Sequence, residues 1–307
     1  MSNSTTPLRF DGRVAIVTGA GGGLGRQHAL ALAARGAKVV VNDFAPMHGS
    51  ESPADAVVAA IRAAGGEAIA NGASVTDEAA VQAMVQQAMD TWGRVDILVN
   101  NAGILRDKSF AKMDLADFKL VLDVHLMGAV HCCKAVWEVM RAQNYGRIVM
   151  TTSSSGLYGN FGQSNYGAAK MALVGLMQTL ALEGAKNNIR VNSLAPTAAT
   201  RMTEGLMPQA VLDLLKPEAV TPALLHLASE DAPTRAILCA GAGTFERAYI
   251  TLTQGVHLGL GADTPEQVAA AFDEISQREE GETVPDSGTA QGSNEVGQAM
   301  RAMRGED

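Results

Sequence analysis

The sequence of 307 residues has few cysteines, no run of basic residues and no long uninterrupted apolar stretch. Its three cysteines, two of them the neighbours Cys132 and Cys133, are too few for a disulfide framework and lack metal-ligand spacing. We therefore expect reduced thiols and no metal. The formal net charge is −8, which argues against nucleic acid as a partner. No stretch of about 18 apolar residues is present, so no membrane span is expected.

Neither end carries a recognisable targeting signal. The start, "MSNSTTPLRF", lacks a basic segment followed by an apolar one, and the end, "RGED", matches no targeting tag. A reducing cytoplasm is the expected location.

Short β-rich apolar runs alternate with longer helical patterns through the first 240 residues. Strands that are apolar along their whole length are typical of a parallel sheet covered by helices on both faces. We therefore predict an α/β fold with a doubly wound, mostly parallel sheet. The predicted strands are residues 14–18, 38–42, 67–70, 96–100, 147–152, 190–194 and 236–240. Helices are predicted over 76–92, from an apolar stripe at helical spacing, and from Asp114 onward, with Asp117 in the first turn.

The C-terminal part differs in character from the residues before it. Residues 263–276 predict a helix with Thr264 as N-cap, Pro265 at the first helical position and Gln267 completing a capping box. No aromatic residue follows Phe272, and 277–307 is typical of a flexible tail. We predict one domain over residues 1–262 and a C-terminal extension, 263–307, made of a helix and this tail.

A glycine-rich turn, "TGAGGGLG" (18–25), follows the first predicted strand and runs into a helix. Missing side chains let a backbone approach a pyrophosphate, and N–H groups at a helix start favour its negative charge. We predict that Gly19, Gly23, Leu24 and Gly25 bind a dinucleotide, as in a Rossmann-like fold. A tight strand–helix connection without a ligand is the alternative.

The ends of the second and fourth predicted strands extend this hypothesis. Asp43 lies 18 residues beyond Gly25, where an acid accepts hydrogen bonds from the ribose hydroxyls of adenosine. A 2′-phosphate would meet a like charge there, and no Arg or Lys lies within the turn, so NAD is predicted rather than NADP. The segment "VNNAG" (99–103) predicts further cofactor contacts from Asn101, Ala102 and Gly103.

In "GQSNYGAAK" (162–170), Tyr166 and Lys170 are four residues apart, which places them on one helix face. The fifth predicted strand runs into "TTSSSG" (151–156), at the carboxyl ends of the strands, where the dinucleotide is predicted to bind. Oxidising a carbinol requires a base that takes the hydroxyl proton as hydride leaves. A tyrosinate can do this if a nearby ammonium lowers its pKa, and a serine hydroxyl can orient the substrate oxygen. An ordinary surface pair is the alternative for Tyr166 and Lys170.

Together these features resemble the short-chain dehydrogenase/reductase family over roughly residues 10–260. The matching motifs are the "TG…G.G" turn, "NNAG" and "YGAAK". The resemblance implies an NAD-dependent oxidoreductase acting on secondary alcohols. The family's spacing, a serine thirteen positions before the tyrosine, implies Ser153 as the catalytic serine. Tyr166 is then the base and Lys170 its activating ammonium, and both are also expected to bind the cofactor.

The stretches "NNAGILRDKSFA" and "YGRIVMTTSSSGLYGNFGQSNYGAAK" resemble more closely the branch of the family that oxidises (3R)-hydroxyacyl-CoA to 3-oxoacyl-CoA in fatty acid β-oxidation. The likeness implies an acyl-CoA substrate, for which Arg106, Lys108, Lys112 and Arg201 are candidate cations; a solvated surface is their alternative. A steroid, steroid-CoA or other secondary-alcohol dehydrogenase, a carrier-protein-linked ketoacyl reductase and a non-catalytic NAD-binding regulator are the alternative functions.

Two positions depart from the wider family. His125 replaces an asparagine that supports a water in the family's proton relay, so the resemblance implies a catalytic role; a packed structural histidine is the alternative. Ser74 and Val75 replace an acid that contacts adenine, and a backbone contact there is implied instead.

A further departure is Thr197, which follows Pro196 where the family usually has glycine. Ala198, Ala199, Thr200 and Arg201 are implied near the nicotinamide carboxamide and pyrophosphate. Relatives pair through the long helices on either side of the fifth strand, so a homodimer or homotetramer is implied.

Overall fold

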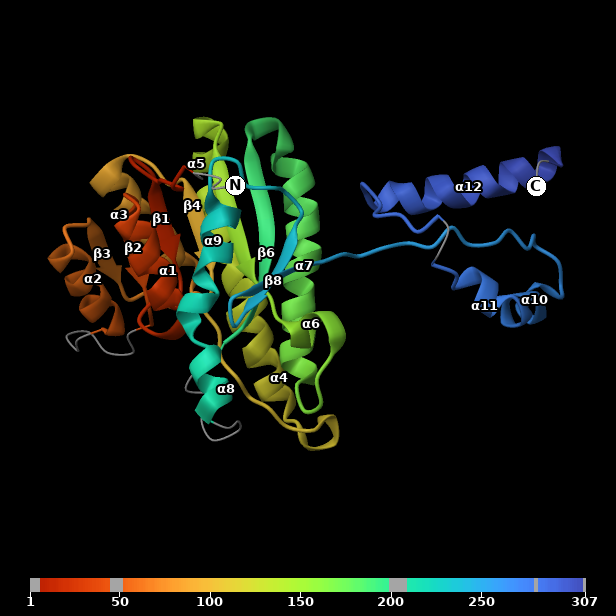
Figure 1. The fold of residues 1–307 in the computed structure, drawn as a ribbon, viewed down its shortest axis with the longest axis horizontal. Coiled ribbons are helices and arrows are strands. Elements are labelled where there is room, and N and C mark those ends of the chain that lie inside the picture. Colours follow the sequence, from red (N-terminus) through yellow and green to blue (C-terminus); the bar gives the residue numbers. More distant parts are fainter. Residues whose placement is uncertain (1–5, 45–51, 199–208, 279–280, 306–307) are drawn as a thin grey trace, which may run out of the picture. The chain divides into compact units, whose positions relative to one another are not determined.

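The computed structural model describes residues 6–44, 52–198, 209–278 and 281–305. The chain divides into two compact units, Met1–Arg247 and Ala248–Asp307. The second unit thus begins before residue 263, where the sequence placed the start of the extension. The first unit contains one eight-stranded sheet with the order β3-β2-β1-β4-β5-β6-β7-β8 (Figure 1). Its strands are β1 (Val14–Val17), β2 (Lys38–Asn42), β3 (Ala68–Asn71), β4 (Ile97–Asn100), β5 (Gly146–Thr151), β6 (Ile189–Thr197), β7 (Ile237–Gly241) and β8 (Thr244–Ala248).

The strands from β1 to β7 pair in parallel, and β1 lies between β2 and β4, where the strand order reverses. Every residue of β1, β4 and β5 is buried, because helices cover both faces of the sheet. The predicted doubly wound, mostly parallel sheet is therefore confirmed. The edge strand β8 was not predicted, because its sequence "TFERA" is largely exposed and lacks the apolar run of the other strands.

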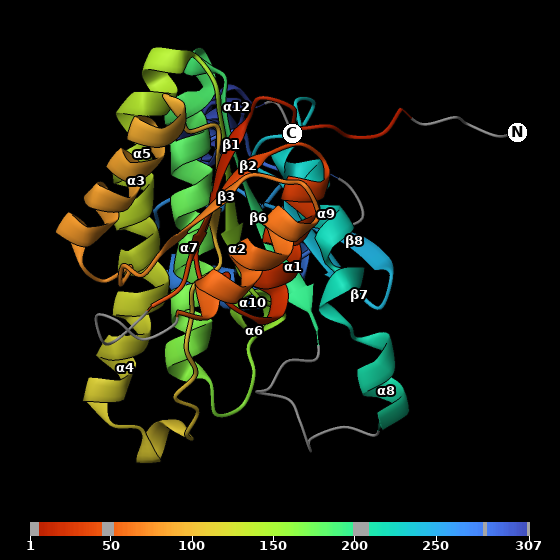
Figure 2. The same ribbon diagram turned by 90° about the vertical axis from the view of Figure 1, so that its left-hand side faces the viewer.

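Helices α1, α2 and α9 cover one face of the sheet, and α3, α5 and α7 cover the other (Figures 1 and 2). The helices of the first unit are α1 (Gly23–Ala34), α2 (Pro53–Ala63), α3 (Glu78–Trp92), α4 (Leu115–Leu122), α5 (Gly128–Gln143), α6 (Ser154–Tyr158), α7 (Ser164–Gly184), α8 (Gln209–Leu214) and α9 (Thr221–Ala228). Shorter helical turns are η1 (Phe110–Lys112), the π-helical η2 (Asp123–Met127), η3 (Ala185–Asn187) and η4 (Pro217–Ala219).

Local sequence explains where two of these helices begin. Asp77 caps α3, because its carboxylate accepts a hydrogen bond from the Ala80 N–H at 3.0 Å. Asp114 caps α4 in the same way, and Asp117 places acid in the first turn, which confirms the predicted start.

Among the residues that the structure describes, the run Leu115–Gln143 has the length and mean hydropathy of a membrane span, contrary to the sequence-based expectation. It comprises α4, η2 and α5. Its buried face packs on α3, α7, β4 and β5, as the core helix of an α/β domain does. Length and composition alone are weak evidence for a span, because such core helices pass the same test.

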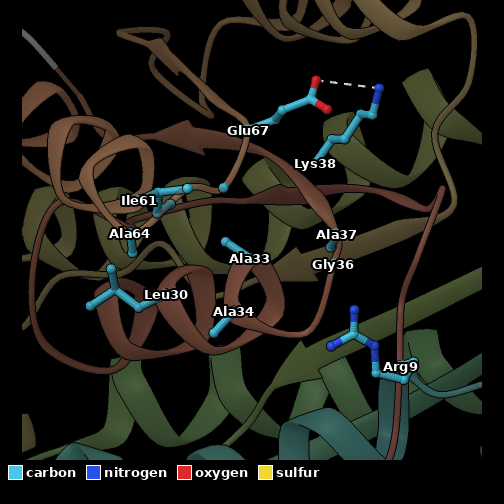
Figure 3. Close-up of a pocket in the computed structure, with 12 residues that line it drawn as sticks. Arg9, Leu30, Ala33, Ala34, Gly36, Ala37, Lys38, Ile61, Ala64 and Glu67 are labelled. Atoms are coloured by element: carbon cyan, nitrogen blue, oxygen red, sulfur yellow. Dashed lines mark ion pairs between the residues drawn. The ribbon is translucent and has the colours of Figure 1, made fainter.

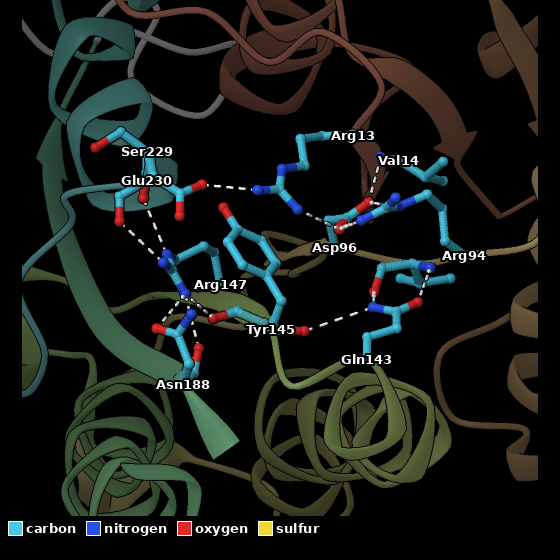
Figure 4. A network of polar contacts seen from close by, with 12 residues as sticks. Arg13, Val14, Arg94, Asp96, Gln143, Tyr145, Arg147, Asn188, Ser229 and Glu230 are labelled. Carbon is cyan, nitrogen blue, oxygen red and sulfur yellow. Dashed lines mark hydrogen bonds and ion pairs between the residues drawn. The ribbon is translucent and has the colours of Figure 1, made fainter. Parts of the chain in front are cut away.

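A buried arginine ties together the sheet end that lies away from the glycine-rich turn (Figure 4). Arg147, at the start of β5, is fully buried and donates hydrogen bonds to the carbonyl oxygens of Asn188, Ser229 and Glu230 at 2.8–2.9 Å. Its guanidinium also lies 4.2 Å from the centre of the Tyr145 ring. Ser229 and Glu230 belong to the loop after α9. The charge-assisted hydrogen bonds from Arg147 therefore hold this loop against β5.

The second unit contains α10 (Thr264–Ala270), α11 (Phe272–Ile275) and α12 (Gly288–Arg304). Two expectations were wrong here. Asp263, not Thr264, occupies the N-cap of α10, and no side chain caps it. Much of the predicted flexible tail is the helix α12, because Val296, Met300 and Met303 recur at helical spacing; the low aromatic content concealed this pattern.

Candidate active site

The glycine turn after β1 offers an open backbone at the start of α1. A Cβ added to Gly22 or Gly23 would meet no atom within 4 Å, whereas one added to Gly25 would lie 2.2 Å from the Gly19 carbonyl oxygen. Gly19 and Gly23 also have positive φ, +61° and +52°. Leu24 packs against the core beneath the turn. The turn therefore fits a pyrophosphate, which needs exposed N–H groups at a helix start.

The segment after β4 braces this turn. The Asn101 side-chain amide donates to the carbonyl oxygens of Thr18 and Gly19, both at 3.0 Å. The Thr18 hydroxyl accepts from the N–H groups of Asn101 and Ala102, also at 3.0 Å. A Cβ on Gly19 would lie 2.8 Å from the Ala102 Cα. The predicted cofactor residues Asn101 and Ala102 thus hold the shape of the turn.

Asp43 lies at the end of β2 and faces the same turn. Its Oδ2 accepts a hydrogen bond from the Gly21 N–H at 2.7 Å, and a Cβ on Gly21 would lie 2.7 Å from that oxygen. The same Cβ would lie 2.4 Å from the Pro53 Cβ, so a larger residue at position 21 would displace its neighbours. The hydrogen bond from Gly21 directs the carboxylate toward the turn, in the place where the ribose hydroxyls of a dinucleotide would need an acceptor.

The adenine-side prediction falls on the loop after β3. The Ser74 hydroxyl is hydrogen-bonded to that of Thr76 at 2.8 Å. Val75 is buried, and its carbonyl oxygen lies 2.9 Å from Nδ1 of His131 on α5. The Ser74 hydroxyl and the Val75 carbonyl oxygen thus have partners within the chain.

Ser153, Tyr166 and Lys170 meet at the carboxyl end of β5. Ser153 follows β5 at the N-cap of α6, while Tyr166 and Lys170 lie on α7. The Lys170 Nζ donates to the Thr151 carbonyl oxygen at 2.6 Å and lies 5.4 Å from the centre of the Tyr166 ring. The Ser153 hydroxyl accepts a hydrogen bond from the Ser155 N–H at 3.2 Å, and it lies near enough to Tyr166 to favour the phenolate. The Thr152 hydroxyl donates to the Lys170 carbonyl oxygen at 2.7 Å, which fixes α7 against the strand end.

Burial controls the titration of this pair. It lowers the pKa of Lys170 to about 7, because the residue is only 3% exposed and its ammonium is desolvated. Burial also raises the pKa of Tyr166 above its ordinary value, with the Ser153 hydrogen bond opposing and the Asp107 charge adding to that rise. We expected Lys170 to lower the Tyr166 pKa. In the protein chain by itself, desolvation outweighs any such effect.

His125 lies in the π-helical turn η2, behind the Tyr166 ring. The two rings meet edge to face, with centres 5.2 Å apart. The His125 Nε2 lies 2.8 Å from the carbonyl oxygen and 3.0 Å from the N–H of Ile104. Burial lowers the His125 pKa to about 3, and the nearby Lys170 adds to this effect. His125 is therefore neutral. The predicted cofactor residue Gly103 packs against the same ring, since a Cβ added to it would lie 2.2 Å from the ring.

The remaining predicted site residues divide into two groups. Ala198, just beyond β6, packs against the core. Ala199, Thr200 and Arg201 lie outside the described residues.

Some residues that shape the site were not among those predicted for it. Thr18 and Gly21 act on the turn through the hydrogen bonds described above. The Asn165 side-chain amide donates to the Arg106 carbonyl oxygen at 3.0 Å, which holds the loop after β4 beside Tyr166. The "TG" pair at the end of the first strand was a signal for Thr18. Hydrogen bonds to backbone carbonyl oxygens, by contrast, have no sequence pattern, because every residue carries such a group.

The cations predicted to meet the CoA phosphates are partly neutralised. Arg106 and Lys108 lie 3.7 and 3.6 Å from opposite oxygens of the Asp117 carboxylate. Lys112 is exposed, and Arg201 lies outside the described residues. One acid is therefore shared by two of the four predicted cations.

Residues 13–210 match the short chain dehydrogenase family. The chain belongs to the short-chain dehydrogenase family. Membership confirms the predicted class of enzyme, a dehydrogenase, and agrees with the doubly wound sheet. It also gives the constellation of Ser153, Tyr166 and Lys170 an enzymatic context that helix spacing alone does not provide.

Three comparisons place this short-chain dehydrogenase among known proteins. It is 50% identical over 270 residues to peroxisomal multifunctional enzyme type 2 of Drosophila melanogaster, covering 86% of this chain and 45% of that protein. The full-length structure of that enzyme matches with a TM-score of 0.80 and 39% identity over 96% of this chain and 51% of that chain. The chain thus spans about half of that relative. A 7α-hydroxysteroid dehydrogenase, solved with NADH and 7-oxo glycochenodeoxycholic acid, matches with a TM-score of 0.70 and 32% identity over 76% of this chain and 95% of that chain.

A separate hollow of about 310 Å³ lies at the start of β2, at the opposite end of the strands from this site; Figure 3 shows its lining residues. Its floor is formed by apolar residues of α1 and α2, and at its mouth Lys38 and Glu67 form an ion pair at 3.3 Å. None of the residues predicted for catalysis or cofactor binding lines it. The chemistry belongs to the other end of the strands, where ligands of doubly wound sheets bind.

Proposed function

We propose that this short-chain dehydrogenase oxidises (3R)-hydroxyacyl-CoA to 3-oxoacyl-CoA with NAD. The observation that carries the proposal is the meeting of Ser153, Tyr166 and Lys170 beside a glycine turn that faces an acid, Asp43. The likeness of the catalytic segments to (3R)-hydroxyacyl-CoA dehydrogenases and the match to a multifunctional enzyme support the substrate class.

The glycine turn and Asp43 would hold the pyrophosphate and adenosine ribose of NAD, which supplies the hydride acceptor when bound. Ser153 donates a hydrogen bond to the substrate oxygen and fixes its position. The Tyr166 phenolate takes the hydroxyl proton, so that the carbon loses a hydride and the oxygen a proton. Lys170 is positioned to hold the nicotinamide ribose and, when charged, to favour the phenolate.

His125 completes this proposed site without carrying charge. With a pKa of about 3 it stays neutral at neutral pH, so its ring supports the Tyr166 ring and the Ile104 backbone. We propose this supporting role in place of proton transfer by its imidazolium.

The test is NADH formation from matched (3R)- and (3S)-hydroxyacyl-CoA esters by the wild type and Tyr166→Phe. We expect turnover of the (3R) series alone and a loss of at least about 100-fold in the variant, because the base is removed. NAD binding, followed by fluorescence, should survive in the variant and shows that the site is intact. If the wild type bound NAD but formed no NADH from any ester, the result would contradict the proposed substrate class.

A steroid or other secondary alcohol is the second candidate substrate. The similarity to a 7α-hydroxysteroid dehydrogenase favours it, since the reacting residues specify a carbinol and not what surrounds it. Hydroxysteroids tested in the same assay separate the two functions: turnover of these without turnover of acyl-CoA would select the second.

We also propose a homodimer or homotetramer formed through α5 and α7. Met127 beside α5, with Met171 and Leu182 on α7, leaves apolar surface exposed at this face. Light scattering would show the mass directly, and a monomer would contradict the proposal.

A cytoplasmic location remains the proposal from the sequence, although the names of several relatives place those proteins in peroxisomes. Imaging of a fluorescent fusion in the source cells would decide between the two compartments.

A further inference from the structure

Three large aromatic side chains stand in solvent next to the catalytic residues. Phe110 is 73% exposed, Tyr158 74% and Phe161 91%. We call these three residues the aromatic rim. The chain has few aromatic residues, 4% of the total, and in a folded protein such rings are usually buried. Exposed apolar rings gathered at one place indicate a surface that binds something apolar.

The rim belongs to two segments that are hydrogen-bonded to each other. The Lys108 N–H donates to the Gly162 carbonyl oxygen at 2.9 Å, and the Gln163 side chain donates to Asp107 at 2.7 Å. Phe110 therefore lies close to the loop that carries Phe161.

The same loop leads directly to the catalytic residues. Tyr158 and Phe161 lie in the stretch between Ser153 and Tyr166, and Asn165 ties this stretch to the Arg106 carbonyl oxygen at 3.0 Å. Any molecule that reacts at Tyr166 and extends outward along this loop meets the rim.

We propose that the aromatic rim binds the acyl chain of the substrate and sets a preference for longer chains. This inference rests on the proposed function and names the part of the substrate that this surface recognises. The carbons of a hydroxyacyl chain beyond the reacting C3 are apolar, and covering exposed rings with methylenes removes both from water. Each methylene added to the acyl chain is therefore expected to strengthen substrate binding until the rings of the rim are covered.

Charge favours the acyl chain over the CoA moiety as the occupant. Beside the rim, Asp117 is shared by Arg106 and Lys108, and Asp107 adds a second acid. Residues 106–117 carry three cations, Arg106, Lys108 and Lys112, and three acids, Asp107, Asp114 and Asp117, which leaves no net positive charge to attract phosphates there. The anionic end of the substrate is then expected to leave the site in another direction.

The test compares kcat/KM for (3R)-hydroxyacyl-CoA esters of four, eight and twelve carbons. We expect the wild type to favour the longest ester. In the double variant Phe110→Ser and Phe161→Ser, kcat/KM for twelve carbons should fall about tenfold, while that for four carbons stays within about twofold. Phe245→Ser is the matched control, because Phe245 is an exposed phenylalanine on the edge strand β8 and should leave both values unchanged.

An unchanged ratio between long and short esters in the double variant would overturn the proposal. A change of mass in light scattering without a change in that ratio would show instead that the rim joins copies of the chain, which also overturns it. No turnover of any ester by the wild type would refute the proposed function and this inference together. Turnover with an unchanged ratio would refute the inference alone.

Discussion

Replacing Lys170 by methionine should stabilise the folded chain while removing activity. Methionine has a similar length and no charge, so it fits the site that Lys170 occupies on α7. The ammonium is buried, and it donates a hydrogen bond from Nζ to the Thr151 carbonyl oxygen at 2.6 Å. A buried charge with so little compensation costs folding free energy.

The size of the effect follows from the pKa. Each pH unit corresponds to about 1.4 kcal/mol, so holding the amine at about 7 instead of 10.5 costs the folded chain about 5 kcal/mol below pH 7 and about 4 kcal/mol at pH 7. Losing the hydrogen bond to Thr151 costs about 1–3 kcal/mol. Lys170→Met should therefore raise the free energy of unfolding by about 1–3 kcal/mol at pH 7, while NADH formation falls by at least about 100-fold.

The pH dependence distinguishes this cause from simple packing. Between pH 7 and 10.5, the unfolded chain binds a proton at Lys170 that the folded chain rejects, so the stability of the wild type rises with pH through this window. The variant lacks that rise, and its advantage should shrink as the pH increases. Urea denaturation at pH 7, 8 and 9 measures the difference.

The control is Lys134→Met on α5, where the lysine is exposed and the change should stay within about 0.5 kcal/mol. A Lys170→Met variant that is less stable than the wild type at pH 7 would refute the reasoning. So would a difference between the two that stays constant as the pH rises.

Three further outcomes are expected. Gly25→Ala should lower the free energy of unfolding by about 1–3 kcal/mol, because its Cβ meets the Gly19 carbonyl oxygen, whereas Gly22→Ala should leave thermal unfolding unchanged and weaken NAD binding alone. Asp43→Asn should raise KM for NAD about tenfold and improve use of NADP; an unchanged ratio of the two KM values would contradict the role of the carboxylate. Burial lowers the pKa of His28 to about 3, so the unfolded chain binds the extra proton and acid destabilises the wild type between pH 6.5 and 3; His28→Leu should lose about 2 kcal/mol less between pH 7 and 5 in urea denaturation, and equal losses would exclude this cause.

The elements that local sequence specifies were predictable. Continuous apolar runs bounded by polar or glycine-rich segments identified the strands of the parallel sheet, whereas β8, which is largely exposed and lacks such a run, was not predicted. Helix starts at Asp77 and Asp114 depend on carboxylates that bond to N–H groups two or three residues away. Such patterns need no tertiary contact. In the second unit composition and spacing disagree: the lack of aromatic residues after Phe272 predicts a flexible tail, whereas Val296, Met300 and Met303 recur at helical spacing and lie on α12.

The candidate site could be predicted as far as its motifs reach. The glycine turn, Asp43 and the pair Tyr166 and Lys170 are each readable from spacing along the chain, because a strand end or a helix turn places them. That Ser153 joins this pair followed from family resemblance, and the structure places Ser153 at the N-cap of α6, near enough to Tyr166 to favour the phenolate.

What the sequence determined by itself was therefore the strands β1 to β7 and the candidate motifs, the glycine turn and the pair Tyr166 and Lys170, since both arise from periodicity and short-range geometry. Only the tertiary structure decided their electrostatic state. Lys170 loses much of its charge and His125 stays neutral because segments distant in sequence bury them. Likewise, Asn101 braces Thr18 across 83 positions, a contact that exists only once β1 and β4 lie side by side. Desolvation and long-range hydrogen bonds are properties of the packed chain, and no local pattern encodes them.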